Sequence, residues 1–144
     1  MVGYNEIIWV KKGVKVAEDK KKVFIVDDDE SICRALKFLL TTYGFEVETF
    51  ISGLAFFNIV SDTAPGCLIL DINMPGFDGW EVQEIQKRLE MAQSKRQIIF
   101  MTGNKSVEYK ERAMKTGAVG FLQKPFNDQE LVDLVNRSFL NSPS

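Results

Sequence analysis

The sequence contains no histidine. This absence excludes Ser-His-Asp triads, Cys-His nucleophile pairs, the common zinc sites and any phosphohistidine carried by this chain itself. Cysteine is scarce too, because Cys33 and Cys67 are the only two and lack the close spacing of a metal-binding motif. We expect both to be small buried thiols in a reducing cytoplasm.

The chain also lacks long apolar runs and an excess of positive charge. Its longest runs, such as IIWV and CLIL, are far shorter than the ~20 residues of a membrane-spanning helix, and no secretory leader is recognisable. The net charge is −2 at pH 7, so the surface carries no bulk basic field for nucleic acid. We therefore expect a cytoplasmic protein with neither a membrane nor a nucleic-acid partner in this chain.

The composition that is present suits one globular domain. The chain has 144 residues, of which 45% are hydrophobic and 26% charged. Residues 1–21 differ from the rest, because lysine clusters at 11–12 and 20–22 flank a weak apolar alternation. An extra strand, a hairpin and an added leader all fit that pattern. We therefore treat 1–21 as an extension of unknown role and 22–141 as the domain.

Beyond residue 21, strand-like and helix-like patterns alternate five times. Apolar runs typical of buried strands occupy 23–26, 67–70, 98–101 and 119–122, and a further short strand is expected at 45–50. Amphipathic stretches follow them at 32–43, 52–60, 78–89, 106–117 and 127–139. Several helix starts carry capping residues, such as Ser52 and the pair Asp78 and Glu81. This alternation predicts an α/β fold, with a doubly wound parallel sheet, right-handed crossovers and helices on both faces.

Polar residues stand where four of these strands end. They are Asp27 and Asp28 after the first strand, Asp71 after the third, Thr102 after the fourth and Lys124 after the fifth. Parallel sheets place their sites beyond the carboxyl ends of the strands, at the point where the strand order reverses. We therefore expect these side chains to converge at one edge of the sheet.

The chemistry of this set indicates a phosphoryl site with a metal ion. Neighbouring carboxylates repel one another unless a cation balances them, and Mg²⁺ prefers oxygen ligands supplemented by water or phosphate oxygens. The ammonium of Lys124 and the hydroxyl of Thr102 complete a setting for a phosphoryl group carried on a carboxylate. We expect Asp29, Glu30 and Ser31 to serve instead as capping and first-turn residues of the next helix.

Together these motifs resemble the response regulator receiver domain of two-component signalling. The matching pieces are VDD (26–28), LDINMPGFDGW (70–80), FMTG (100–103), AMKTGAVGFL (113–122) and KPF (124–126). They span the chain from residue 22 to about residue 140 and are most similar to receivers of nitrogen-fixation-type transcription regulators. The resemblance implies a flavodoxin-like or CheY-like (βα)5 fold with strand order 2-1-3-4-5.

The same resemblance implies a role for each acidic residue of the site. Asp71 matches the phosphoacceptor, which takes a phosphoryl group from a phosphohistidine. Asp28 matches the direct Mg²⁺ ligand, and Asp27 the acid that usually acts through water. Asn73 is expected to offer its backbone carbonyl to the metal. The protein is then a stoichiometric phosphoacceptor and not an enzyme, apart from slow self-dephosphorylation.

Further residues match the family's switch. Thr102 matches the hydroxyl that moves to the phosphoryl oxygen, Lys124 the salt-bridging lysine and Phe121 the switch aromatic. The family usually has a cis peptide before the proline that matches Pro125, and X-Pro bonds carry only a small trans preference. The implied partners are a histidine kinase or a histidine phosphotransfer protein, and a second copy bound through the fourth helix, fifth strand and fifth helix.

The output stays open at this point. Many regulators of the nitrogen-fixation type carry a C-terminal DNA-binding domain, whereas this chain ends at NSPS directly after its last expected helix. The chain is therefore either a stand-alone receiver or part of a longer regulator, with DNA as a partner only in the second case.

Two other functions compete with this interpretation. A phosphatase of the haloacid dehalogenase type would use Asp27 as nucleophile and Asp29 as acid. The order of motifs argues against it, because Asp71 precedes Thr102 and no acidic pair follows Lys124. A receiver-like binding module that is never phosphorylated is the second alternative, although all five motif positions are filled here.

Overall fold

The computed structural model describes residues 21–92 and 96–140. The alternatives for residues 1–20 lie outside the described residues. The strands are β1 (Lys22–Val26), β2 (Glu46–Phe50), β3 (Cys67–Asp71), β4 (Gln97–Thr102) and β5 (Gly120–Gln123). The helices are α1 (Glu30–Thr42), α2 (Gly53–Ile59), α3 (Gly79–Ala92), α4 (Val107–Lys115) and α5 (Asp128–Leu140).

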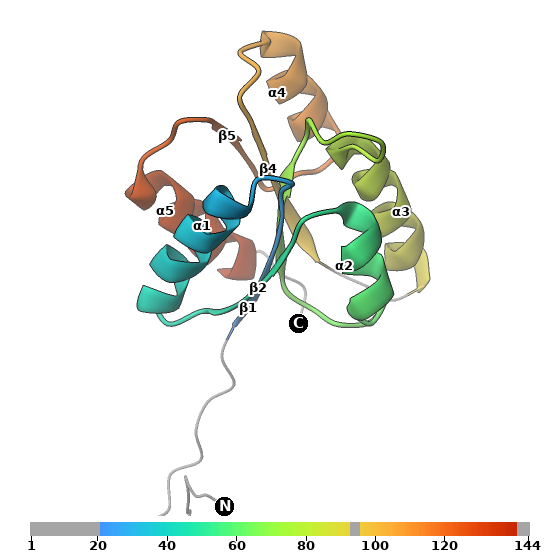
Figure 1. Cartoon of the computed structure of the whole chain (residues 1–144). Helices are drawn as coiled ribbons and strands as arrows, with labels where there is room; N and C mark the ends of the chain where they lie inside the picture. The colour runs from blue at the N-terminus through green and yellow to red at the C-terminus, as the bar shows by residue number, and fades with distance from the viewer. Residues whose placement is uncertain (1–20, 93–95, 141–144) are drawn as a thin grey trace, which may run out of the picture.

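The five strands form one sheet in the order β2-β1-β3-β4-β5, and every neighbouring pair is parallel. The predicted doubly wound α/β fold and its strand order are therefore confirmed. Figure 1 shows α1 and α5 on one side of the sheet and α2 and α3 on the other. The strand order reverses between β1 and β3. Sites in such folds lie beyond the carboxyl ends of the strands at this point.

Each face of the sheet buries its own apolar cluster, because successive strand residues point to opposite faces. Val23 and Ile25 of β1 belong to the cluster under α1 and α5, whereas Phe24 and Val26 belong to the cluster under α2, α3 and α4. The central strand β3 is buried along its whole length. Burial on both faces explains why β1 and β3 read as nearly continuous apolar runs in the sequence.

Helix starts follow the capping residues expected from the sequence. Ser52 accepts a hydrogen bond from the backbone of Ala55 at the start of α2. Asp78 and Glu81 cap α3 reciprocally, each side chain accepting from the backbone N–H of the other at 3.0 and 2.9 Å. Such caps satisfy N–H groups that have no partner within the helix. They therefore fix where each helix leaves the edge of the sheet that carries the site.

A buried arginine connects neighbouring segments at the end of the sheet opposite the acidic residues. Arg96 donates through Nη1 to the carbonyls of Ser61 and Ala64 at 3.2 and 2.6 Å, and through Nε to Gln86 Oε1 at 3.2 Å. Its guanidinium also lies 5.1 Å from the ring centre of Phe56. The side chain thus joins the α2–β3 connection to α3. The sequence contains no pattern that would single out this arginine.

The two cysteines are buried free thiols, as expected. Burial raises the pKa of Cys33 to about 11 and that of Cys67 to about 12. None of the described helices is both long and apolar enough to cross a membrane.

Candidate functional site

Three carboxylates meet where β1 and β3 end. Asp27 and Asp71 are only 1% and 4% exposed, whereas Asp28 is open to solvent. Carboxylate oxygens of Asp27, Asp28 and Asp71 all lie within 4.8 Å of one another. The contact arises because β1 and β3 are adjacent and in register up to Val26 and Leu70. The predicted convergence of these three acids is thus present in the structure.

The sheet brings Lys124 to the same place from the end of β5. Its Nζ lies 2.8 Å from Asp27 Oδ2 and 3.2 Å from Asp71 Oδ1. Burial alone would lower the pKa of Lys124, but its hydrogen bonds and charge interactions with the two aspartates outweigh this and raise it. The peptide bond between Lys124 and Pro125 is cis, as the sequence led us to expect.

The pKa of the Asp71 carboxyl group is raised above its ordinary value. Burial and the nearby charge of Asp27 raise the pKa of Asp71 to about 6, against the opposing effect of Lys124. A carboxylate that is costly to ionise lowers its free energy by gaining a cation or a hydrogen-bond donor. Gly79 allows α3 to begin close by, because a Cβ there would lie 2.6 Å from the Asp71 carbonyl oxygen.

The acidic cluster fits a small divalent cation. All three side chains offer carboxylate oxygens, the donor type that Mg²⁺ takes, and only one of them is exposed enough to leave room for water ligands. Such an ion would be held by Asp27, Asp28 and Asp71. Asn73 lies two residues past Asp71, and the role expected for its backbone carbonyl stays a prediction.

Asp29 has the separate task that the sequence indicated. Its carboxylate accepts from the backbone N–H groups of Ser31 and Ile32 at 2.9 and 3.4 Å and caps α1. Hydrogen bonding, from the Ser31 hydroxyl above all, holds the pKa of Asp29 below its ordinary value. The backbone N–H of Asp29 donates to Asp27 Oδ1 at 2.8 Å, so the turn also orients the buried acid.

Thr102 is fully buried at the end of β4. Its hydroxyl accepts from the backbone N–H of Asn104 at 3.0 Å and donates to Asn73 Oδ1 at 2.7 Å. Phe121 is half-buried on β5 and packs against the apolar cluster under α4. The sequence pointed to Thr102 and Phe121 but not to the side chain of Asn73.

A second set of residues next to the site was missed in the sequence. Asn73 Nδ2 donates to the Tyr109 hydroxyl of α4 at 3.4 Å. The Tyr109 ring stands edge-on to Trp80 at 5.8 Å between ring centres, and the Arg112 guanidinium lies 4.1 Å over the Trp80 ring. An aromatic residue at helical spacing gives no signal that would distinguish this contact from ordinary core packing.

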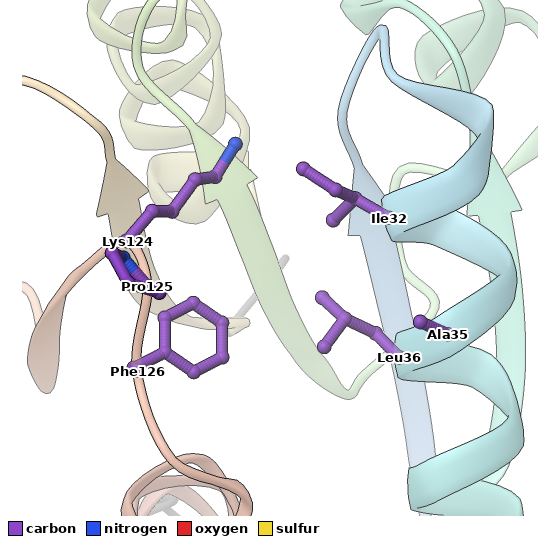
Figure 2. A pocket seen from close by; sticks show the side chains of 6 residues that line it. All are labelled: Ile32, Ala35, Leu36, Lys124, Pro125 and Phe126. Atoms are coloured by element: carbon purple, nitrogen blue, oxygen red, sulfur yellow. The ribbon is translucent and has the colours of Figure 1, made fainter.

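An apolar cavity opens beside Lys124 (Figure 2). It has a volume of about 370 Å³ and lies between α1 and the β5–α5 connection. Its lining residues are Ile32, Ala35, Leu36, Lys124, Pro125 and Phe126. In Figure 2 the lysine amine points away from the Phe126 ring. This amine is the group that contacts Asp27 and Asp71.

This site and fold define a receiver, and comparison with known proteins agrees. The chain matches the family described as response regulator receiver domain over residues 23–136. It therefore belongs to the response regulator receiver domain family, whose features include an aspartyl phosphate and Mg²⁺. This membership sets aside the haloacid dehalogenase alternative.

Similar proteins include transcriptional regulators. The chain is 39% identical to the transcriptional regulatory protein FixJ of Bradyrhizobium diazoefficiens over 81% of this chain and 55% of FixJ. It is 41% identical to nodulation protein W of the same organism, over 83% of this chain and 51% of that protein. The chain spans about half the length of these curated relatives. Among solved structures, FIXJ-N matches with a TM-score of 0.78 at 32% identity, over 88% of this chain and 99% of the other.

Proposed function

We propose that Asp71 is the phosphoacceptor, which takes a phosphoryl group from a phosphohistidine on a sensor kinase or phosphotransfer protein. In that step the P–N bond of the donor breaks and a P–O bond to Asp71 forms. The observation that carries the proposal is the position of Asp71, at the end of the central strand with Asp27, Asp28 and Lys124 around it.

The hydrogen bonds favour Asp71 over its two neighbours as the nucleophile. Both oxygens of Asp27 are engaged, Oδ1 by the backbone of Asp29 and Oδ2 by Lys124. Asp28 is exposed and less confined. Asp71 uses Oδ1 for Lys124, and among the described residues no hydrogen bond occupies its Oδ2. That oxygen is therefore available to attack phosphorus.

The remaining groups of the site stabilise the charge that the phosphoryl group brings. Mg²⁺, when bound, would supply positive charge to the phosphoryl oxygens. Asp27, Asp28, Asp71 and the backbone carbonyl of Asn73 would hold it. Lys124 provides a fixed ammonium 3.2 Å from Asp71. Thr102 turns its hydroxyl to a phosphoryl oxygen, and Phe121 follows it inward.

This makes the protein a stoichiometric switch of a two-component system and not a turnover enzyme. The cytoplasm is the compartment we infer for it, with a histidine kinase or phosphotransfer protein as donor. The apolar cavity supports docking of that donor, since it is lined by Lys124, whose amine contacts Asp71. The signal then leaves through α4, β5 and α5, as a homodimer or towards another partner, and DNA is a partner only through a further domain.

We also retain the domain boundaries inferred from the sequence, with a receiver at 22–141 preceded by an extension of unknown role at 1–21. Among the described residues, the first strand begins at Lys22 and the last helix ends at Leu140. These bounds support the assignment.

Intact-mass measurement after treatment with acetyl phosphate and Mg²⁺ tests the proposal. The wild type should gain one phosphoryl group and the Asp71→Asn variant none. Asp62→Asn, which changes a carboxylate outside the site, is the matched control and should gain the group as the wild type does. No gain in the wild type would leave the binding-module alternative, and an equal gain in Asp71→Asn would move the acceptor elsewhere.

A further inference from the structure

The hydroxyl of Thr102 has one proton and two neighbours. Because the backbone N–H of Asn104 donates to its oxygen at 3.0 Å, the hydroxyl is the acceptor in that contact. Its single proton therefore goes to Asn73 Oδ1, which lies 2.7 Å away. As long as that bond persists, Thr102 has no proton to give to a phosphoryl oxygen on Asp71.

The orientation of the Asn73 amide is itself set by a second contact. With Oδ1 turned to Thr102, Nδ2 points to the Tyr109 hydroxyl at 3.4 Å and donates to it. This bond is longer than the usual range of 2.7–3.2 Å and is thus weak. It nevertheless gives the Nδ2 group of Asn73 a hydrogen-bond partner. Thr102, Asn73 and Tyr109 therefore form a continuous chain of hydrogen bonds from β4 to α4.

The Tyr109 ring is held by its neighbours on α3. Trp80 lies between Phe100 of β4, at 4.9 Å, and Tyr109, at 5.8 Å between ring centres. Arg112 covers the Trp80 ring at 4.1 Å, one turn further along α4. An independent bond from Gln83 Nε2 to Thr116 Oγ1, at 2.6 Å, fixes the far end of α4 to α3. The packing of α4 against α3 therefore determines the position of the Tyr109 hydroxyl.

We propose that Tyr109 is a positioning residue that acts through the Asn73 side chain to keep the Thr102 hydroxyl away from the phosphoacceptor. Removal of its hydroxyl frees the amide of Asn73 to rotate, which weakens the hold on Thr102. The reverse holds as well, since a Thr102 that turns to a phosphoryl oxygen releases Asn73 and loosens one attachment of α4. The relay thus links the site to α4 by polar contacts that Phe121 does not make.

The proposal rests on the proposed function only where it concerns the phosphoryl group, so two measurements are needed. The first uses the unliganded protein and follows the NMR signal of the Thr102 methyl group, whose shift reports the side-chain rotamer. Tyr109→Phe keeps the ring beside Trp80 and removes only the hydroxyl. We expect this variant to shift the methyl signal. Gln83→Met removes the hydrogen bond from α3 to Thr116 and should leave the signal unchanged.

The second measurement titrates each protein with beryllofluoride in the presence of Mg²⁺. Tyr109→Phe should bind about two- to tenfold more tightly than the wild type, the effect of one lost hydrogen bond, whereas Gln83→Met should bind like the wild type. Asn73→Ala should also bind more tightly, and adding Tyr109→Phe to it should change nothing further, because Tyr109 acts through Asn73.

Three outcomes would overturn the relay: an unchanged Thr102 methyl signal in Tyr109→Phe, an equal effect of Gln83→Met, or additive effects of Tyr109→Phe and Asn73→Ala. A wild type that binds no beryllofluoride would contradict the proposed function instead. In that case the methyl signal still decides whether Tyr109 sets the rotamer of Thr102.

Discussion

Lys124 Nζ lies 2.8 Å from Asp27 Oδ2, although the two residues are 97 positions apart in the chain. Asp27 follows β1 and Lys124 follows β5, and β3 and β4 lie between these two strands in the sheet. The ion pair therefore spans the site from one side to the other. Asp27 is nearly fully buried, and a buried carboxylate that loses its cation is strongly destabilising. The lysine is therefore as much a part of the fold's stability as of the site.

Magnesium affinity should separate Asp28 from Asp29. Asp28→Ala removes an oxygen from the acidic cluster and should weaken Mg²⁺ binding by roughly tenfold or more. Asp29→Ala removes the cap of α1, with a stability cost of about 1 kcal/mol and a smaller loss of affinity. Isothermal titration with MgCl₂ measures both. Equal losses in the two variants would show that the ligand has been misplaced.

Stability should depend on pH through Asp71. The pKa of Asp71 is raised to about 6 in the folded protein, so the folded state binds the proton more tightly than the unfolded chain does. Protonation therefore stabilises the folded state fully at a pH below the pKa of the unfolded chain, which is near 4. That gain is lost as the pH rises through 6. Without metal, Asp71→Asn should therefore be increasingly more stable than the wild type from pH 4 to pH 7.5, by about 1–3 kcal/mol in total.

Urea unfolding in EDTA at several pH values measures this trend. Glu84→Gln, at an exposed position of α3, is the matched control for removing a carboxyl group. A constant difference between Asp71→Asn and the wild type across the range would contradict the raised pKa.

Arg96 should be the arginine on which stability depends most. Arg96→Leu leaves the carbonyls of Ser61 and Ala64 and the Gln86 side chain without this donor. We expect a loss of about 2–4 kcal/mol in the free energy of unfolding, since each buried group left unsatisfied costs about 1–3 kcal/mol. Arg34→Leu removes an arginine whose only ion pair described, with Glu30 at 3.9 Å, is exposed. Its cost should stay below about 0.5 kcal/mol.

Denaturation in urea compares the two arginine variants directly. Similar midpoints for Arg96→Leu and Arg34→Leu would show that the buried contacts of Arg96 contribute little.

Phe121 should turn further inward when the site is activated. A Thr102 that moves to a phosphoryl oxygen leaves a gap, and protein interiors tolerate few voids. A phenyl ring needs no hydrogen-bond partner there, and full burial of its side chain is favourable by about 1.5–3 kcal/mol relative to exposure. Structures with and without beryllofluoride measure the rotamer. An outward ring in the activated form would refute the coupling.

Much of the site could be predicted from the sequence because it depends on the backbone alone. Asp27, Asp71, Thr102 and Lys124 each end an apolar run, and parallel strands bring their ends to one edge regardless of how the side chains pack. Capping residues such as Asp29 are equally local, because a cap bonds to backbone groups two or three positions away. These features follow from periodicity and spacing, which a sequence displays directly.

Only the tertiary structure revealed the contacts between side chains of different elements. Tyr109 meets Asn73 because α4 packs over the β3–α3 connection, and Arg96 reaches carbonyls more than 30 positions earlier in the chain. Such contacts depend on how far each helix is shifted and rotated on the sheet. A helix shifted by one residue would place different side chains against its neighbours. The sequence by itself therefore determined the fold and the charged edge of the sheet, whereas the packing of α3 and α4 decided which polar groups control Thr102.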